Sequence, residues 1–131
     1  MKILIIEDDP VSLKLVSAVL QEGGHVVLPA MSADQAMVSL KTFRPDVILL
    51  DLQLPGIEGL GVARQCRANP ATRLIPIIAV TAFSDDYRRA DALEAGCDGY
   101  LIKPLNTRTL LQQVESVVFA KAQQFSPESG G

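Results

Sequence analysis

The chain alternates short apolar runs with segments whose apolar residues repeat at helical spacing. Five apolar runs stand out, and we expect each to form a β-strand: Ile3 to Ile6, His25 to Leu28, Val47 to Leu50, Ile75 to Val80, and Tyr100 to Ile102. Several runs are continuously apolar, which is typical of parallel strands that are covered on both faces of a sheet. We expect the middle three runs to be the most deeply buried.

The segments between these runs carry the pattern of amphipathic helices. Apolar residues stand three and four positions apart in three of them: Leu13, Val16 and Leu20; Ala33, Ala36, Met37 and Leu40; and Leu110, Leu111, Val114 and Val118. Residues typical of helix ends flank them: Asp9 before Pro10, Ser32 and Ser84 as N-caps, and Gly23-Gly24 and Gly96 as C-terminal stops. The regular alternation predicts an α/β fold with an open, doubly wound parallel sheet, since five units are too few for an eight-stranded barrel.

The length of 131 residues predicts one domain, and 48% hydrophobic with 21% charged residues is ordinary for a globular protein. The helical pattern fades after about residue 119, and the last residues are polar with Pro and Gly. We therefore expect one domain over residues 1–120, followed by a flexible tail over residues 121–131.

Charge and cysteine content narrow the function classes. Twelve Lys and Arg against 15 Asp and Glu give a net charge of −3, which argues against nucleic acid or an anionic membrane as partner. No apolar run approaches the roughly 18 residues of a membrane span, and the N-terminus turns acidic at Glu7, too early for a secretory signal. We therefore expect a cytoplasmic protein.

Cys66 and Cys97 have neither zinc-site nor disulfide-framework spacing, and we expect two buried thiols.

Polar residues follow four of the five predicted strands. They are Glu7, Asp8 and Asp9 after the first run, Asp51 after the third, Thr81 after the fourth, and Lys103 before Pro104 after the fifth. In an open α/β sheet, ligands bind beyond the carboxyl ends of the strands, so these side chains are expected to meet there. Carboxylates held together repel one another unless a cation neutralises them, and their hard oxygens suit Mg²⁺. The sequence therefore predicts a magnesium site.

Such a site gives Asp51 a chemical role. An ionised carboxylate beside Mg²⁺ and the Lys103 ammonium can act as a nucleophile toward phosphorus, with Thr81 and Lys103 holding phosphoryl oxygens. Taken singly, a strand-end Asp is more often a turn or cap residue, and a lone Lys is more often a solvated surface residue. The four strand ends together favour the phosphoryl chemistry.

Four segments resemble the receiver domains of two-component response regulators, in the same order and spacing. They are residues 3–10 (ILIIEDDP), 45–56 (PDVILLDLQLPG), 77–82 (IIAVTA) and 95–104 (AGCDGYLIKP), and the resemblance runs from Lys2 to about Phe119. It implies a flavodoxin-like (βα)5 fold with a five-stranded parallel sheet in the strand order 2-1-3-4-5.

The resemblance also assigns the acidic residues. It implies that Asp51 is the phosphoacceptor, and that Glu7 and Asp8 hold Mg²⁺ together with Asp51 and the backbone carbonyl of Gln53. Asp9, the next acidic residue, is interpreted as a helix cap.

The remaining strand ends receive switch and binding roles from the same resemblance. Thr81 would be the switch hydroxyl, Lys103 would contact the phosphoryl group, and Tyr100 would change rotamer together with Thr81 on activation. Pro104 would follow a cis peptide bond.

The resemblance implies a phosphoacceptor switch that assists its own phosphorylation and dephosphorylation and is not a turnover enzyme. Its partners would be a histidine kinase or a histidine phosphotransfer protein and a downstream protein, and the chain would be a monomer or a weak homodimer.

Two alternatives come from other function classes. The first is a small Mg²⁺-dependent phosphatase of the haloacid-dehalogenase type, but that class has Asp-x-Asp where this chain has Asp51-Leu52-Gln53. The second is a flavodoxin-like cofactor binder, but the chain has no Trp and no Gly-rich phosphate loop.

Overall fold

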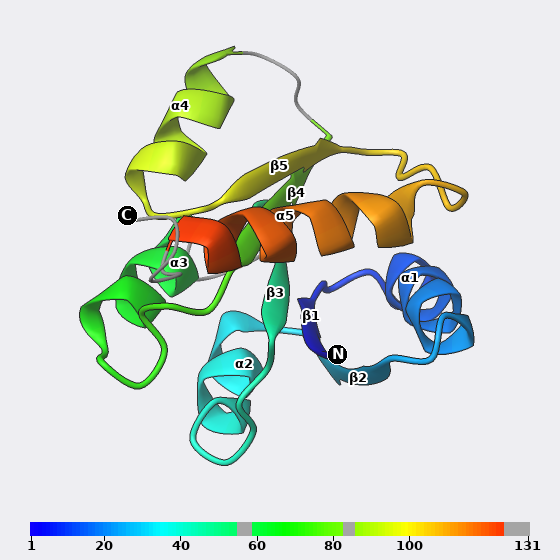
Figure 1. Ribbon diagram of the computed structural model, residues 1–131, viewed down its shortest axis with the longest axis horizontal. Helices are drawn as coiled ribbons and strands as arrows, with labels where there is room; N and C mark the ends of the chain where they lie inside the picture. Colours follow the sequence, from blue (N-terminus) through cyan, green and yellow to red (C-terminus); the bar gives the residue numbers. More distant parts are fainter. Residues whose placement is uncertain (55–58, 83–85, 125–131) are drawn as a thin grey trace.

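The computed structural model describes residues 1–54, 59–82 and 86–124, with the side chains of residues 86–88 left out (Figure 1). Strands and helices alternate through this part of the chain. The strands are β1 (Lys2–Ile6), β2 (Val26–Ala30), β3 (Val47–Asp51), β4 (Ile77–Thr81) and β5 (Gly99–Ile102). The helices are α1 (Pro10–Glu22), α2 (Ala33–Ser39), α3 (Gly59–Ala68), α4 (Asp86–Glu94) and α5 (Leu110–Gln124).

The five strands form one parallel sheet in the order β2-β1-β3-β4-β5, which confirms the predicted fold class and strand order. One expectation about burial was wrong. The second strand was predicted to be among the most buried, but β2 lies at the sheet edge and is largely exposed or half-buried, whereas β1 is central and buried from Ile3 to Ile6. Burial follows the order of strands in the sheet, which differs from their order in the chain. The edge position also explains Pro29 within β2, because a proline there leaves no central ladder bond unmade.

Helices cover both faces of the sheet. On one face, α1 and α5 pack through Leu13, Val16, Leu20, Leu110 and Val114 onto β1, β3 and β4. On the other face, α2, α3 and α4 pack onto the same strands. Figure 1 shows these layers, with α5 running across the strands. None of the described helices is long and apolar enough to span a membrane.

Several predicted helix ends are confirmed, and other predicted boundaries differ from the observed ones. The Asp9 side chain accepts from the amides of Val11 and Ser12 at the start of α1, and Ser32 caps α2 in the same way. Gly24 and Gly96 have positive φ just after α1 and α4, as expected of helix stops. The predicted cap at Ser84 lies outside the described residues.

The last helix and two strands differ in extent from the prediction. Helix α5 continues to Gln124, past the expected domain end at residue 120, and Lys121 is ion-paired at 2.9 Å with Asp98. Strand β2 extends two residues beyond Leu28 to Ala30, and β4 begins at Ile77 instead of Ile75.

A half-buried charge network fixes the end of the sheet opposite the strand carboxyl ends. The Asp98 carboxylate accepts from Arg67 Nη2 of α3 at 2.7 Å, from Lys121 Nζ of α5 at 2.9 Å, and from the Ile77 amide of β4 at 2.9 Å. Arg67 also donates from Nε to the Gly96 carbonyl at 2.9 Å. One carboxylate thus ties two helices on opposite faces to the central sheet.

The two cysteines are buried and not bonded to each other, as expected. Burial raises the pKa of the Cys66 thiol, and it raises the pKa of Cys97 to about 12. Both side chains therefore stay protonated near neutral pH and act as packing groups in the core.

Candidate functional site

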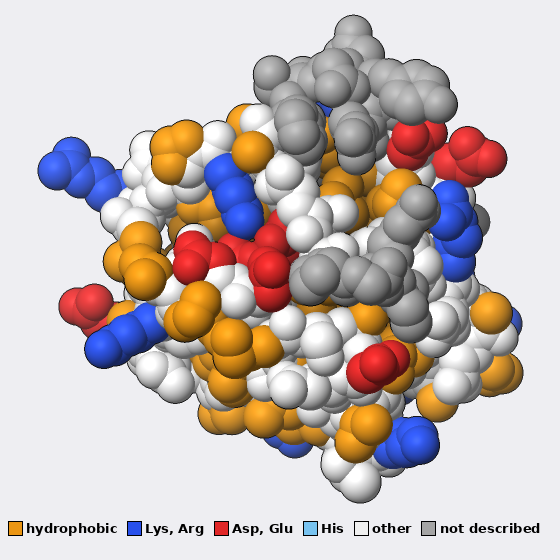
Figure 2. Space-filling view, turned by 180° about the vertical axis from the view of Figure 1, so that it is seen from behind, with side chains coloured by type: hydrophobic (Ala, Val, Ile, Leu, Met, Phe, Trp, Pro, Cys, Tyr) orange, Lys and Arg blue, Asp and Glu red, His pale blue; other side chains and the backbone are white. Residues whose placement is uncertain are grey.

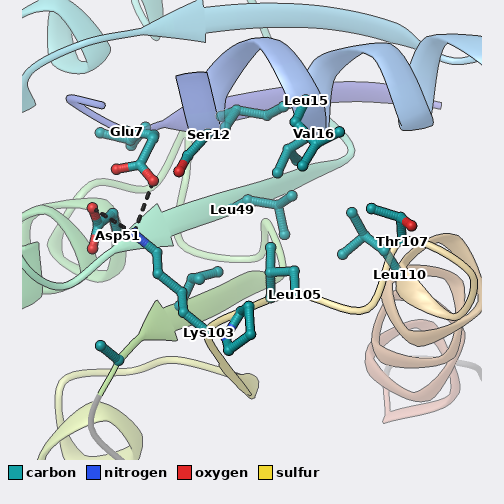
Figure 3. Close-up of a pocket in the computed structure, with 15 residues that line it drawn as sticks. Glu7, Ser12, Leu15, Val16, Leu49, Asp51, Lys103, Leu105, Thr107 and Leu110 are labelled. Carbon is teal, nitrogen blue, oxygen red and sulfur yellow. Dashed lines mark hydrogen bonds and ion pairs between the residues drawn. The ribbon is translucent and has the colours of Figure 1, made fainter. Parts of the chain in front are cut away.

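The carboxyl ends of β1, β3 and β5 bring Glu7, Asp51 and Lys103 together. Lys103 Nζ donates to Glu7 Oε1 at 2.8 Å and to Asp51 Oδ2 at 3.3 Å, although Lys103 and Glu7 are 96 residues apart in the chain. Figure 3 shows the Lys103 side chain reaching from its strand end to both carboxylates. The peptide bond between Lys103 and Pro104 is cis, as predicted.

The acidic residues form a cluster that can hold a cation. Carboxylate oxygens of Glu7, Asp8 and Asp51 lie within 4.8 Å of one another. Glu7 and Asp51 are only 6% and 4% exposed, whereas Asp8 is exposed. On the face shown in Figure 2, acidic side chains gather beside a basic one. The three carboxylates thus lie together as the sequence predicts, and their role as metal ligands stays a prediction.

One oxygen of this cluster lacks a protein partner. Within the described residues, Glu7 Oε2 is the only buried side-chain oxygen or nitrogen without a hydrogen bond. A buried carboxylate oxygen without a donor is costly, and a divalent cation with hard-oxygen preference would satisfy it. The donor set therefore fits Mg²⁺.

The neighbouring loop holds Asp51 in place. The Gln53 amide donates to Asp51 Oδ1 at 2.9 Å, so the two carboxylate oxygens face different donors. The predicted role of the Gln53 carbonyl as a metal ligand stays a prediction.

The close packing of charges changes the proton affinities of the site. Burial of the Glu7 carboxyl, reinforced by the neighbouring Asp51 carboxylate and opposed by Lys103, raises the pKa of Glu7 to about 7. Burial disfavours the Lys103 ammonium, but its hydrogen bond to Glu7 and the negative charge of Asp51 outweigh that effect and raise the pKa of Lys103. Lys103 therefore remains a cation at neutral pH, whereas the pKa of Glu7 lies close to neutral pH.

Thr81 and Tyr100 lie on the other face of the sheet from Glu7 and Asp51. Tyr100 pairs in register with Ala79, and Thr81 follows two residues later on the same strand, so the two side chains point to the same face. Thr81 is 1% exposed and Tyr100 is half-buried, with the Arg89 guanidinium 5.8 Å from its ring centre. The structure thus places the two predicted switch residues on one face of adjacent strands.

Sequence reasoning missed an apolar cavity that opens beside the acidic cluster. The cavity measures about 410 Å³ and lies between α1, the sheet and the connection from β5 to α5 (Figure 3). Its walls include Leu15, Val16, Leu49, Leu105 and Leu110, while Glu7, Asp51 and Lys103 line one end. Leucines at helical spacing predict core packing, and nothing in their pattern signals that space remains between them.

Comparison with known proteins agrees with this geometry. The chain belongs to the family of response regulator receiver domains, whose model matches residues 3–115. The transcriptional regulatory protein AfsQ1 of Streptomyces coelicolor is 38% identical over 116 residues, which make up 88% of this chain and 50% of AfsQ1. The chain therefore spans about half the length of that curated relative.

Two further relatives match over almost their whole length. Protein PilH of Pseudomonas aeruginosa is 32% identical over 117 residues, which are 89% of this chain and 97% of PilH. The receiver domain of the sensor histidine kinase PA1611 from the same organism was solved with a magnesium ion coordinated in its active site cleft. It superimposes with a TM-score of 0.82 at 34% identity, over 90% of this chain and 97% of that domain.

Proposed function

We propose that this receiver is a phosphorylation switch in which Asp51 accepts a phosphoryl group from a histidine kinase or a histidine phosphotransfer protein. The observation that carries the proposal is the grouping of Glu7, Asp8, Asp51 and Lys103 at one end of the sheet. The magnesium ion in the cleft of the PA1611 receiver domain supports the assignment of the acidic cluster to Mg²⁺.

The chemistry is a transfer to a carboxylate. A bond forms between an Asp51 carboxylate oxygen and phosphorus, the bond from phosphorus to the donor nitrogen of phosphohistidine breaks, and that nitrogen keeps the electron pair. Bound Mg²⁺ would neutralise charge on the phosphoryl oxygens, with Glu7, Asp8 and Asp51 as its protein ligands. Lys103 is held by two carboxylates at the same end of the sheet, where its ammonium can bind a phosphoryl oxygen.

Phosphorylation would be transmitted across the sheet through Thr81. The phosphoryl group adds about −1.5 to −2 charge and three acceptor oxygens at the end of β3, which favours a state with the Thr81 hydroxyl turned toward it. Movement of Thr81 would free space for Tyr100, which lies on the same face two register positions away. The surface around Tyr100 would then bind a downstream protein.

The first test is the intact mass of the protein after incubation with acetyl phosphate, with and without Mg²⁺. We expect a single Mg²⁺-dependent phosphoryl adduct in the wild type and in the control variant Asp34→Asn, which changes an exposed carboxylate on α2. Asp51→Asn should form none. A phosphoryl adduct formed by Asp51→Asn in the same yield as by the wild type would overturn the proposal. So would the absence of an adduct in a wild type shown to bind Mg²⁺.

The switch role of Thr81 has a separate test. Thr81→Ala removes the hydroxyl but leaves Asp51 and Lys103 in place, so we expect it to accept the phosphoryl group without the accompanying change at Tyr100. Aromatic ring signals of Tyr100 in NMR spectra, recorded before and after phosphorylation, measure this coupling. A Thr81→Ala protein whose Tyr100 signals shift as in the wild type would contradict the assigned role.

A further inference from the structure

The cavity beside the acidic cluster combines an aliphatic interior with a charged end. Leu15 and Val16 of α1, Leu49 of β3, and Leu105 and Leu110 of the β5–α5 region form its apolar walls. Its volume of about 410 Å³ falls within the range of about 300–1,000 Å³ that is usual for small-molecule sites. The space is therefore large enough for an aliphatic ligand and open enough to admit one.

The polar groups of this cavity gather where it meets the site. Lys103 Nζ stands at that end, between Glu7 and Asp51, and its side chain is 25% exposed. An ammonium has three N–H donors, and two of them are used on described residues, which leaves one for a ligand. The cation at the mouth and the leucines behind it favour a ligand with an anionic head and an apolar tail.

We propose that this cavity binds a small amphipathic oxyanion, with its head against Lys103 and an aliphatic tail of about four to eight carbons between α1 and the β5–α5 connection. The anionic head would bind the Lys103 ammonium, which is the group that would otherwise hold a phosphoryl oxygen. A bound ligand therefore blocks phosphorylation of Asp51, and this second clause rests on the proposed function.

The charges of the site determine when the head binds. Among the described residues, the three carboxylates of Glu7, Asp8 and Asp51 outnumber the Lys103 ammonium that faces two of them. An anion is therefore expected to bind more tightly when Mg²⁺ neutralises the carboxylates than when the cation is removed with chelator.

Chain length provides the direct test. Ethyl, butyl and hexyl phosphate are titrated into Mg²⁺-loaded protein and followed by amide NMR shifts, with inorganic phosphate as head-only control and hexanol as tail-only control. Burial of a methylene contributes up to about fourfold in affinity, so we expect an increase of about two- to fourfold per methylene, or about 15- to 250-fold from ethyl to hexyl. A matching series of butanoate and hexanoate distinguishes a general oxyanion site from one selective for phosphate.

Two wall variants locate the binding. Leu15→Gln places a polar amide on the cavity wall, and the fold should tolerate it because Leu15 is 54% exposed. Leu105→Phe instead reduces the free volume of the cavity. Both should lose most of the chain-length gain and keep the affinity for inorganic phosphate. Leu93→Gln is the matched control, since Leu93 is 57% exposed on α4, outside the cavity, and it should behave as the wild type.

The outcomes separate this inference from the proposed function. Equal affinity for ethyl and hexyl phosphate, or wild-type hexyl phosphate binding by both wall variants, would overturn the cavity site. Hexyl phosphate should also slow adduct formation from acetyl phosphate more than ethyl phosphate does; an unchanged rate at saturating hexyl phosphate would overturn the blocking clause. Failure of acetyl phosphate to modify Asp51 in ligand-free protein would instead overturn the proposed function.

Discussion

The buried Glu7 carboxyl makes the metal-free protein sensitive to pH, and Glu7→Gln tests this directly. Burial is the main cause that raises the pKa of Glu7 from 4.5 to about 7 in the folded protein. Between these two values the folded state holds a proton that the unfolded state has released. Stability of the metal-free wild type therefore falls as pH rises through this window. Gln has the same shape, still offers an oxygen to Lys103, and does not titrate.

The size of the effect follows from the two pKa values. Integrating the proton uptake from about pH 5 to about pH 8 gives a loss of about 2–3 kcal/mol of unfolding free energy that is specific to Glu7. Other groups change stability over the same range in both proteins, so the difference between variant and wild type isolates Glu7. Relative to the wild type, Glu7→Gln should gain this amount between the two pH values.

Urea unfolding followed by circular dichroism, in chelator at both pH values, measures the difference. Glu115→Gln, which alters an exposed carboxylate on α5, is the matched control for loss of one negative charge. Added Mg²⁺ at the higher pH should raise the unfolding free energy of the wild type above that of Glu7→Gln, because the wild type binds the ion and Glu7→Gln loses a ligand. A pH-independent stability difference between Glu7→Gln and the wild type would refute the reasoning.

Three further predictions concern the site and the network behind it. Because Mg²⁺ needs an ionised Glu7, its binding should release about one proton at pH 6, about half a proton at pH 7 and almost none at pH 8.5, measured by calorimetry in buffers of different ionisation enthalpy. Asp98→Ala should lower the unfolding free energy by about 2–4 kcal/mol because it removes the ion pairs with Arg67 and Lys121 and the acceptor of the Ile77 amide, whereas Asp98→Asn, which retains an acceptor, should cost less in urea unfolding. Gly59→Ala would place a Cβ 2.7 Å from the Asp51 backbone oxygen, so it should cost about 1–3 kcal/mol and slow adduct formation from acetyl phosphate; wild-type values for both would contradict this packing.

Local patterns in the sequence were sufficient for the alternation of strands and helices and for several helix starts. The apolar runs and helical stripes predict the alternation, and Asp9 and Ser32 predict helix starts because each supplies a side-chain acceptor for free amides. Sheet order is a property of the whole chain, which is why periodicity alone overestimated the burial of β2. The resemblance to receiver domains supplied the strand order that periodicity lacked.

The acidic cluster could be predicted from the sequence, whereas the Asp98 network and the cavity could not. Glu7, Asp8 and Asp51 each follow or end a parallel strand, and the carboxyl ends of such strands share one edge of the sheet. The Asp98 network was not predictable, because Arg67 and Lys121 read as ordinary charged helix residues and meet only through packing from opposite faces. The cavity is likewise a matter of how closely side chains fill space.

The ion pair between Lys103 and Glu7 joins residues 96 positions apart. During synthesis, the acidic residues that follow the first strand emerge long before the lysine that balances them, and the nascent chain carries an incomplete site until β5 has been added. The Lys103–Glu7 ion pair can form only once the first and last strands have both docked on the sheet. In refolding experiments, the formation of this pair would mark the docking of the last strand.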